Sequence, residues 1–220
     1  QQNGLYATFL PKPIRGLNGS GLHIHQSLAY HKTGRNAFYD PGDAHGLSQI
    51  AKHFIAGQLA HAHAMCAVLA PLVNSYKRLV SGYEAPTHVS WARVNRSALI
   101  RIPRADRPQA TRAELRCPDS GCNPYLALAV MLAAGLDGIR RQLPVPPASD
   151  ENLFRPNPAR LNTPDYLPRS LEAALRALEQ DQVIQAALGG HICERLIAAR
   201  QMEIKSYSRA VSPAELQDLI

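Results

Sequence analysis

The spacing of apolar residues predicts both strands and helices in this chain. Residues 22–28 broadly alternate between apolar and polar, the period of a half-buried strand, so His23 and His25 are expected on one face. Residues 47–72 repeat apolar positions at helical spacing until Pro71. This pattern predicts one long, mostly buried helix that ends at the proline.

The rest of the chain also contains both strand-like and helix-like segments. Residues rich in β-formers predict strands at 6–10, 88–92, 98–102 and 111–117. Helical periodicity follows in the second half of the chain, at residues 124–139, 170–179, 190–207 and 213–219. The proline-rich residues 143–168 lack such periodicity and are expected to form a long ordered loop or flap.

Several helix starts carry a capping residue in the sequence. Asn123 is placed to act as an N-cap, and Pro124 suits the first helical turn, where no N–H is needed. Ser170 and Ser212 precede two of the later helices in the same way.

Composition narrows the classes of function. With 220 residues and 45% hydrophobic content, the chain can bury a core. Its 24 Lys and Arg against 17 Asp and Glu give a net charge of +7, but the cations form no runs interleaved with aromatics, so nucleic acid is not an expected partner. Many arginines between residues 86 and 118 instead stand singly, which suits contacts with individual anions.

The sequence also predicts a reduced, cytoplasmic protein without a membrane partner. No apolar run approaches the roughly 18 residues that cross a bilayer. The four cysteines show no CxxC spacing, and Cys117 and Cys122 are expected to be buried thiols. His61 and His63 lie two residues apart in a predicted helix, so they cannot form an i,i+4 metal pair and are expected to be structural.

A glycine-rich loop that leads into a strand with two histidines is the first candidate for chemistry. Residues 16–21 are rich in Gly and Asn, and backbone amides in such a loop can approach an anion. His23 and His25 could bind a divalent metal or a phosphate oxygen beside it. On these residues alone, ordinary surface or core histidines are the more frequent case.

Five sequence segments in a fixed order decide between these interpretations. Phe9-Leu-Pro-Lys-Pro13 and Asn18-Gly-Ser-Gly-Leu-His-Ile-His25 come first. The segments 74–86, 95–103 and 114–127 follow, with the sequences NSYKRLVSGYEAP, NRSALIRIP and ELRCPDSGCNPYLA. Together they resemble the carboxy-terminal half of the catalytic domain of glutamine synthetases, and the resemblance spans nearly the whole chain.

The resemblance implies a fold and a boundary. The fold is α+β, with a curved, mostly antiparallel sheet and outer helices, similar to that of guanidino kinases. In the family a β-grasp domain and a first catalytic half with Glu-x-Glu precede this region. We therefore expect residues 1–220 to correspond to the carboxy-terminal part alone, and the charge of +7 fits the absence of an acidic half.

The resemblance also implies roles around one site. The expected metal ligands are His23 and Glu114. The expected ATP contacts are His25, Ser27, Arg96 and Arg101. The expected glutamate contacts are Asn18, Gly19, Arg78 and Arg116. The expected catalytic residues are Arg96, which would face the transferring phosphoryl group, and Glu84, a flap carboxylate that would exclude water and take a proton from ammonium.

The implied activity is that of an ATP-dependent glutamate–ammonia ligase that acts through γ-glutamyl phosphate, with Mg²⁺ or Mn²⁺. Glutamate, ATP and ammonium are the implied partners, within a homo-oligomeric ring of commonly twelve subunits, and this part alone is expected to be inactive. Three alternatives stay open: a γ-glutamyl ligase for a larger amine such as a polyamine, a non-catalytic assembly module, and a phosphagen-kinase-like phosphotransferase. An intact Gly82-Tyr-Glu-Ala-Pro86 loop favours ammonia.

Two positions depart from the pattern of the family. Phe154 stands where some bacterial members carry an adenylylated tyrosine, so that modification is not expected here. Gln109 stands where many members carry a lysine that contacts the nucleotide.

Overall fold

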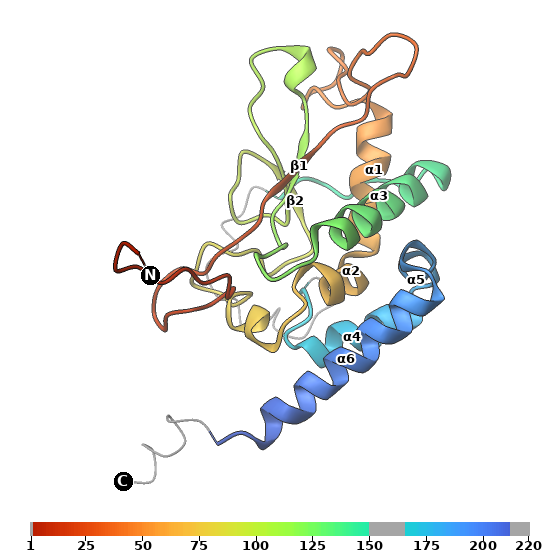
Figure 1. The fold of residues 1–220 in the computed structure, drawn as a ribbon. Coiled ribbons are helices and arrows are strands. Elements are labelled where there is room, and N and C mark those ends of the chain that lie inside the picture. The colour runs from red at the N-terminus through yellow and green to blue at the C-terminus, as the bar shows by residue number, and fades with distance from the viewer. Residues whose placement is uncertain (1, 150–165, 212–220) are drawn as a thin grey trace.

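The computed structural model describes residues 2–149 and 166–211 (Figure 1). Within these residues the strands are β1 (Ile24–Gln26), β2 (Trp91–Arg93), β3 (Ile100–Ile102) and β4 (Ala113–Leu115). The α-helices are α1 (Gln49–Ala60), α2 (Ala62–Leu69), α3 (Pro124–Arg140), α4 (Leu171–Gln180), α5 (Gln182–Leu188) and α6 (Gly190–Arg209). Two short 3₁₀ helices are η1 (Val73–Lys77) and η2 (Pro108–Ala110).

The four strands form one sheet in the order β1-β4-β3-β2. Strand β4 runs antiparallel to both neighbours, and only β2 and β3 are parallel. His25 and Arg101 both lie opposite Glu114 in this register. The predicted α+β fold with a mostly antiparallel sheet is therefore confirmed, and the register brings three candidate site residues together.

The strand predicted at residues 6–10 is wrong. This segment is irregular, and the side chains of Tyr6 and Phe9 are 84% and 75% exposed. A strand needs a neighbour for its N–H and C=O groups, and no described strand pairs with this segment. The residues at 6–10 favour β structure locally, but the described part of the chain offers no strand that pairs with them.

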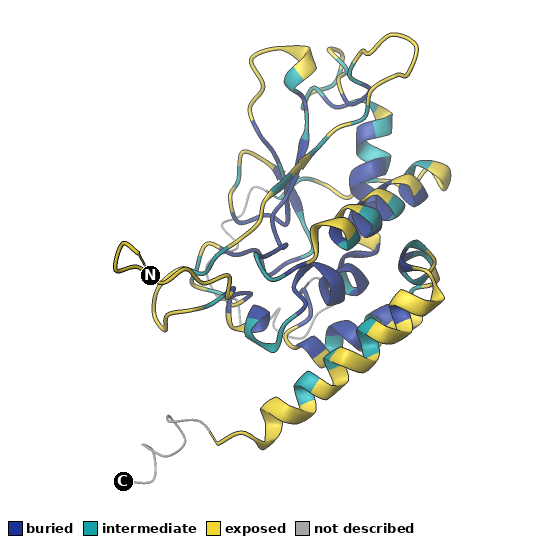
Figure 2. Cartoon of the chain, in the orientation of Figure 1, coloured by how far each residue is buried: buried dark blue, intermediate teal, exposed yellow. Residues whose placement is uncertain are grey.

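Helices α1 and α3 cross at very close range. A Cβ atom on Gly57 would overlap the main-chain oxygen of Ala134, and one on Gly138 would overlap that of His53. One on Gly135 would overlap the ring of Phe54. Glycine at these three positions therefore lets the two helix backbones approach closely. Much of α1 is buried as a result (Figure 2).

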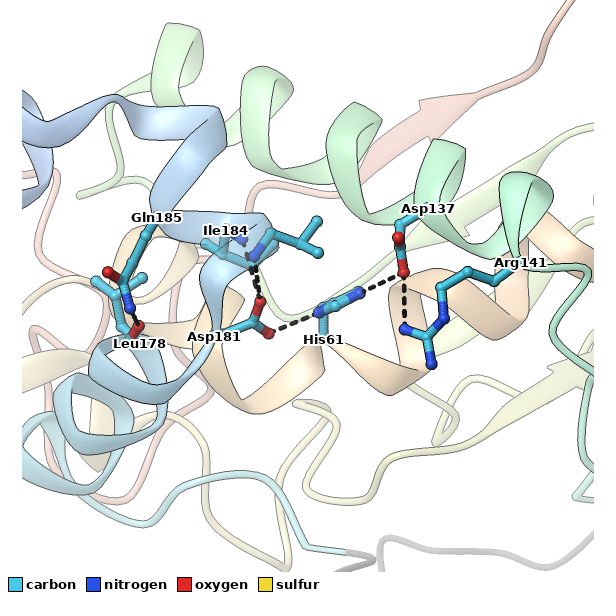
Figure 3. Close-up of polar contacts among 8 residues, drawn as sticks. His61, Asp137, Arg141, Leu178, Asp181, Ile184 and Gln185 are labelled. Carbon is cyan, nitrogen blue, oxygen red and sulfur yellow. Dashed lines mark hydrogen bonds and ion pairs between the residues drawn. The ribbon is translucent and has the colours of Figure 1, made fainter.

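The predicted helix at residues 47–72 is two helices, which meet at His61. The backbone of His61 departs from helical values, with φ −99° and ψ 7°. Its ring is held from both sides: Nδ1 lies 2.6 Å from Asp181 Oδ2, and Nε2 lies 3.1 Å from Asp137 Oδ2 (Figure 3). Asp137 also accepts from Arg141 at 3.0 Å. His61 is therefore structural, as expected, and joins the α1–α2 junction to two other helices.

Asp181 also explains a helix that the sequence pattern did not predict. Its other carboxylate oxygen accepts the backbone N–H groups of Val183 and Ile184, so Asp181 ends α4 and caps α5. The predicted caps Asn123 and Ser170 accept in the same manner at the starts of α3 and α4. Helix α6 lies against α4 and α5, and most of its length is exposed (Figure 2).

The remaining predictions have mixed outcomes. Cys117 and Cys122 are buried thiols, as expected. The predicted helix at residues 213–219, Phe154 and most of the predicted flap at 143–168 lie outside the described residues. In the part of the chain that is described, no helix is long and apolar enough to span a bilayer.

Candidate functional site

A pocket of about 140 Å³ lies where the glycine-rich loop, the end of β4 and the segment after η1 meet. Six of the residues expected to share a site line this pocket: Asn18, Gly19, His23, Arg78, Glu84 and Arg116. Gly21, Tyr83 and Ala85 complete its wall. Residues up to 98 positions apart in sequence are thus neighbours in space, as the order of the motifs predicts.

Glu114 is the buried centre of charge beside the pocket. Its Oε1 lies 3.0 Å from His23 Nδ1 and 3.4 Å from an N–H of Arg116. Its Oε2 accepts from Nε of Arg101 on the neighbouring strand β3. Because Glu114 and Arg116 are two residues apart along the extended chain, their side chains share a face, as predicted.

The arginines determine the protonation of this centre. Burial alone would raise the pKa of Glu114, but the hydrogen bond and charge of Arg101, together with Arg116, lower it overall. Burial and then the charge of Arg116 lower the pKa of His23, although Glu114 opposes the change. Glu114 is therefore a carboxylate and His23 a neutral imidazole at neutral pH, the forms in which each can bind a metal ion.

Positive charge is in excess around this carboxylate. Burial lowers the pKa of Arg116, and the charges of Arg101, Arg78 and Arg96 lower it further, against the opposing effect of Glu114. The charges of three other guanidinium groups therefore act on Arg116, with Glu114 beside it and the buried Asp119 near Arg78. Such an arrangement stabilises a bound anion, because the anion relieves the repulsion among the cations.

Arg78 has a structural task within the pocket wall. Its guanidinium is 3% exposed and donates to the main-chain oxygens of Cys117 at 2.7 Å and Arg116 at 3.1 Å. A Cβ atom on Gly21 would collide with this guanidinium, and one on Gly19 would collide with Pro11 O. Arg78 thus fixes the chain that carries Arg116, and its remaining N–H groups are those left to face a ligand.

Glu84 lies in the wall with its carboxylate exposed to solvent. Its main-chain oxygen accepts a 3.4 Å hydrogen bond from Arg116. Within residues 2–149 and 166–211 its carboxylate forms no ion pair, so the simple alternative of a Glu84–Arg78 pair is not observed. The carboxylate is positioned at the pocket but is not neutralised there.

Besides Glu114, four expected site residues lie outside the pocket wall. His25 accepts from Nε of Arg112 at 3.1 Å on the same sheet, and Arg101 contacts Glu114 behind the wall. Ser27 and Arg96 are exposed, and the charge of Arg96 reaches Arg116. The structure therefore links Arg101 and Arg96 to the charged cluster, but it does not bring His25 or Ser27 into the pocket wall.

Sequence reasoning did not single out Gly21, Tyr83 or Arg112. Gly21 and Tyr83 lie within the recognised segments, and their positions between named site residues were the signal available. Arg112 lies two residues before Glu114, and the alternation of a strand would have placed it on the same face as Glu114.

His23 and Glu114 are the residues here that could contribute to a divalent metal site. A buried carboxylate and a neutral imidazole 3.0 Å apart are suitable ligands for Mg²⁺ or Mn²⁺. Among the residues that the structure describes, no group of three or more His, Cys, Asp or Glu could hold a metal ion. The chain thus fits a metal with two ligands, and further ligands would have to come from elsewhere.

This α+β domain has a cationic pocket beside a His–Glu pair, which is typical of proteins that bind anions. Sequence comparison then identifies the family. The family described as "Glutamine synthetase, catalytic domain" matches residues 1–219. The chain belongs to this family.

Curated relatives are similar to this chain over nearly its whole length. Glutamine synthetase of Thermus thermophilus is 56% identical over 97% of this chain and 48% of its own length. That of Thermotoga maritima is 50% identical over 98% of this chain and 49% of its own length. The chain therefore spans about half the length of the curated relatives it matches.

Solved structures show the same relationship in three dimensions. A structure titled "Apo GmaS without ligand" superposes with a TM-score of 0.84 at 36% identity, over 98% of this chain and 48% of that one. A GmaS/ADP complex gives a TM-score of 0.86 at 36% identity, over 99% and 50%. The fold of this chain is therefore that of half of a larger glutamine-synthetase-type protein.

Proposed function

We propose that this chain is the arginine-bearing half of the active site of an ATP-dependent glutamate–ammonia ligase. The observation that carries the proposal is that Glu114 pairs with both Arg101 and Arg116, while the charges of Arg78 and Arg96 also act on Arg116. This cluster lies beside a pocket whose wall includes Glu84. Amide formation needs a better leaving group on the γ-carboxylate of glutamate, and transfer of the ATP γ-phosphoryl group supplies one. Glutamate, ATP and the acyl phosphate between them are all anionic.

The residues have distinct proposed tasks. Arg116 and Arg78 hold carboxylates of glutamate together with the backbone at Asn18 and Gly19, while Arg101 and Arg96 stabilise phosphoryl charge. His25 and Ser27 contact the nucleotide at the edge of the sheet.

His23 and Glu114 would hold a divalent ion, Mg²⁺ or Mn²⁺, which supplies charge neutralisation for the phosphates. Glu84 attracts ammonium, takes its proton and shields the acyl phosphate from water. The intact protein is proposed to work as a homo-oligomer.

A ligase for a larger amine is not favoured, since the relatives reported above are named glutamine synthetases. Glutamine synthetases reach 56% identity over the same length, and this supports ammonia as the amine. A non-catalytic module would not require an unpaired carboxylate at a pocket surrounded by arginines. The pocket therefore supports a catalytic role for the intact protein.

The test is turnover by the full-length protein with glutamate, ATP and Mg²⁺, with ammonium or a polyamine as the amine. We expect kcat/KM for ammonium to exceed that for the polyamine by at least about tenfold. Arg116→Lys keeps the charge but loses the planar fork, and should reduce turnover with ammonium. A preference for the polyamine, or no turnover with any amine, would reject the proposal. The 220-residue chain alone should show no turnover, because it offers a metal only two ligands.

A further inference from the structure

A second pocket, of about 450 Å³, lies next to the candidate active site. Tyr83 lines both pockets. The walls of the second pocket include Lys12, Arg15, Asn74, Lys77, Val80 and Tyr83. Three of these side chains are cationic and none is acidic, so the pocket has a strong positive potential.

Lys12 is held in place from several directions. Its ammonium lies 3.6 Å from the centre of the Tyr83 ring and donates to the main-chain oxygen of Leu17. Its backbone N–H donates to Asn74 Oδ1 at 2.7 Å, and Asn74 Nδ2 donates back to Lys12 O at 3.1 Å. One wall of the pocket is thus pre-organised around a fixed cation.

The other two cations leave capacity for a ligand. Lys77 donates to the hydroxyl of Tyr207, which neutralises none of its charge. Arg15 is exposed, and its guanidinium presents a planar fork of donors. Among residues 2–149 and 166–211, no carboxylate forms an ion pair with Lys12, Arg15 or Lys77.

We propose that this second pocket binds a small anion with two or more negative charges, either inorganic phosphate or a dicarboxylate. A fixed ammonium, a second ammonium on a flexible stem and a guanidinium fork can together surround one such anion. A monovalent anion would relieve less of the repulsion among the three cations and would bind more weakly.

The position of this pocket gives the bound anion an effect on the candidate active site. Helix η1 carries Lys77 and leads directly to Arg78, and the loop with Lys12 and Arg15 leads to Asn18 and Gly19. Tyr83 directly precedes Glu84. An anion held between these segments would therefore draw together the chain segments that form the active-site wall.

The test measures protection of Lys77 from acetylation in the full-length protein, by mass spectrometry, during titration with phosphate or with glutarate at constant ionic strength. We expect saturable protection by at least one of the two anions. Arg15→Gln should weaken the binding of that anion by about tenfold or more, because it removes the guanidinium group and its charge-assisted hydrogen bonds. Arg35→Gln is the matched control, since it removes an exposed arginine outside the pocket and should leave the affinity unchanged.

A second variant separates this pocket from the candidate active site. Arg116→Gln should leave protection of Lys77 intact, because Arg116 lines only the first pocket. Protection by phosphate alone identifies the ligand as phosphate, and protection by glutarate alone identifies a dicarboxylate. Absence of saturable protection by both, equal affinity in the Arg15 and Arg35 variants, or loss of protection in the Arg116 variant would each overturn the proposal. The readout needs no turnover, so failure of the proposed ligase activity would not affect it.

Discussion

His61 lies 2.6 Å from Asp181, a residue 120 positions further along the chain, and this contact ties the α1–α2 junction to the start of α5. The same ring meets Asp137 of α3 on its other side (Figure 3). The hydrogen bond to Asp181 and then that to Asp137 raise the pKa of His61, although burial opposes them. A buried imidazolium between two carboxylates therefore links three helical segments.

This cluster predicts a dependence of local stability on pH. Since the pKa of His61 is raised on folding, its contribution is complete below the unfolded value of about 6.5 and is lost as pH rises through the folded value. The pKa values of Asp137 and Asp181 are lowered overall, because hydrogen bonds from His61 outweigh burial. Their contributions are therefore present above about pH 4 and are lost as pH falls below it.

The measurement is the free energy of opening of α5, taken from amide exchange corrected for intrinsic rates, between pH 6 and 9. It should decrease in the wild type and stay nearly flat in His61→Gln, which should cost about 3 kcal/mol at pH 6 because Asp137 and Asp181 both lose the ion pair with His61. His191→Gln removes an exposed histidine on α6 and should retain the wild-type slope. Equal slopes in all three proteins would contradict the prediction.

The crossing of α1 and α3 predicts intolerance of a single methyl group. Gly57→Ala would force the new Cβ atom into the backbone of α3, which no side-chain rotation can relieve. We expect destabilisation of about 2 kcal/mol or more, seen as a lower thermal midpoint. Gly190→Ala is the control, because a Cβ atom there meets nothing within 4 Å, and its effect should be no more than about 0.5 kcal/mol. A midpoint that is unchanged in Gly57→Ala would mean that the helices can separate at little cost.

Residue motifs predicted the site better than periodicity predicted the elements. Asn18, Glu84 and Arg116 were expected together because their segments resemble one family in order, and they line one pocket. The break at His61 could not be predicted, since it accompanies contacts with residues 76 and 120 positions away. Only tertiary structure reveals such partners.

Two further features show the same limit. The segment at residues 6–10 has strand-forming residues, yet pairing depends on a neighbour that local sequence does not specify. Arg78 was expected to bind substrate carboxylates, but no local pattern indicates that its guanidinium also donates to the carbonyls of Arg116 and Cys117. The motif predicted that Arg78 lies at the site, whereas its hydrogen-bond partners are seen only in the three-dimensional structure.

Arg96 is predicted to act mainly in the transition state of phosphoryl transfer. It is exposed near the pocket, and its charge reaches Arg116. In the full-length protein, Arg96→Ala should lower kcat by on the order of 10²-fold or more, as removal of a preorganised donor does. KM for glutamate should change little, because phosphoryl charge is greatest at the transition state. Arg195→Ala, on the exposed face of α6, should leave both constants unchanged, and a pure KM effect in Arg96→Ala would assign Arg96 to ground-state binding.

Glu84 offers the sharpest test of the proposed chemistry, because its carboxylate lies in the pocket wall without an ion pair in the described parts of the chain. If it takes a proton from ammonium and shields the acyl phosphate, Glu84→Ala should slow glutamine formation while ATP still binds. Water would then intercept more of the acyl phosphate, so phosphate released per glutamine formed should rise above the wild-type ratio. Glu84→Gln keeps the size of the side chain and loses its charge, so it separates shielding from proton transfer. Glu172→Ala, an exposed carboxylate on α4, should keep the wild-type ratio. An unchanged ratio in Glu84→Ala would show that Glu84 neither shields the intermediate nor directs it to the amine.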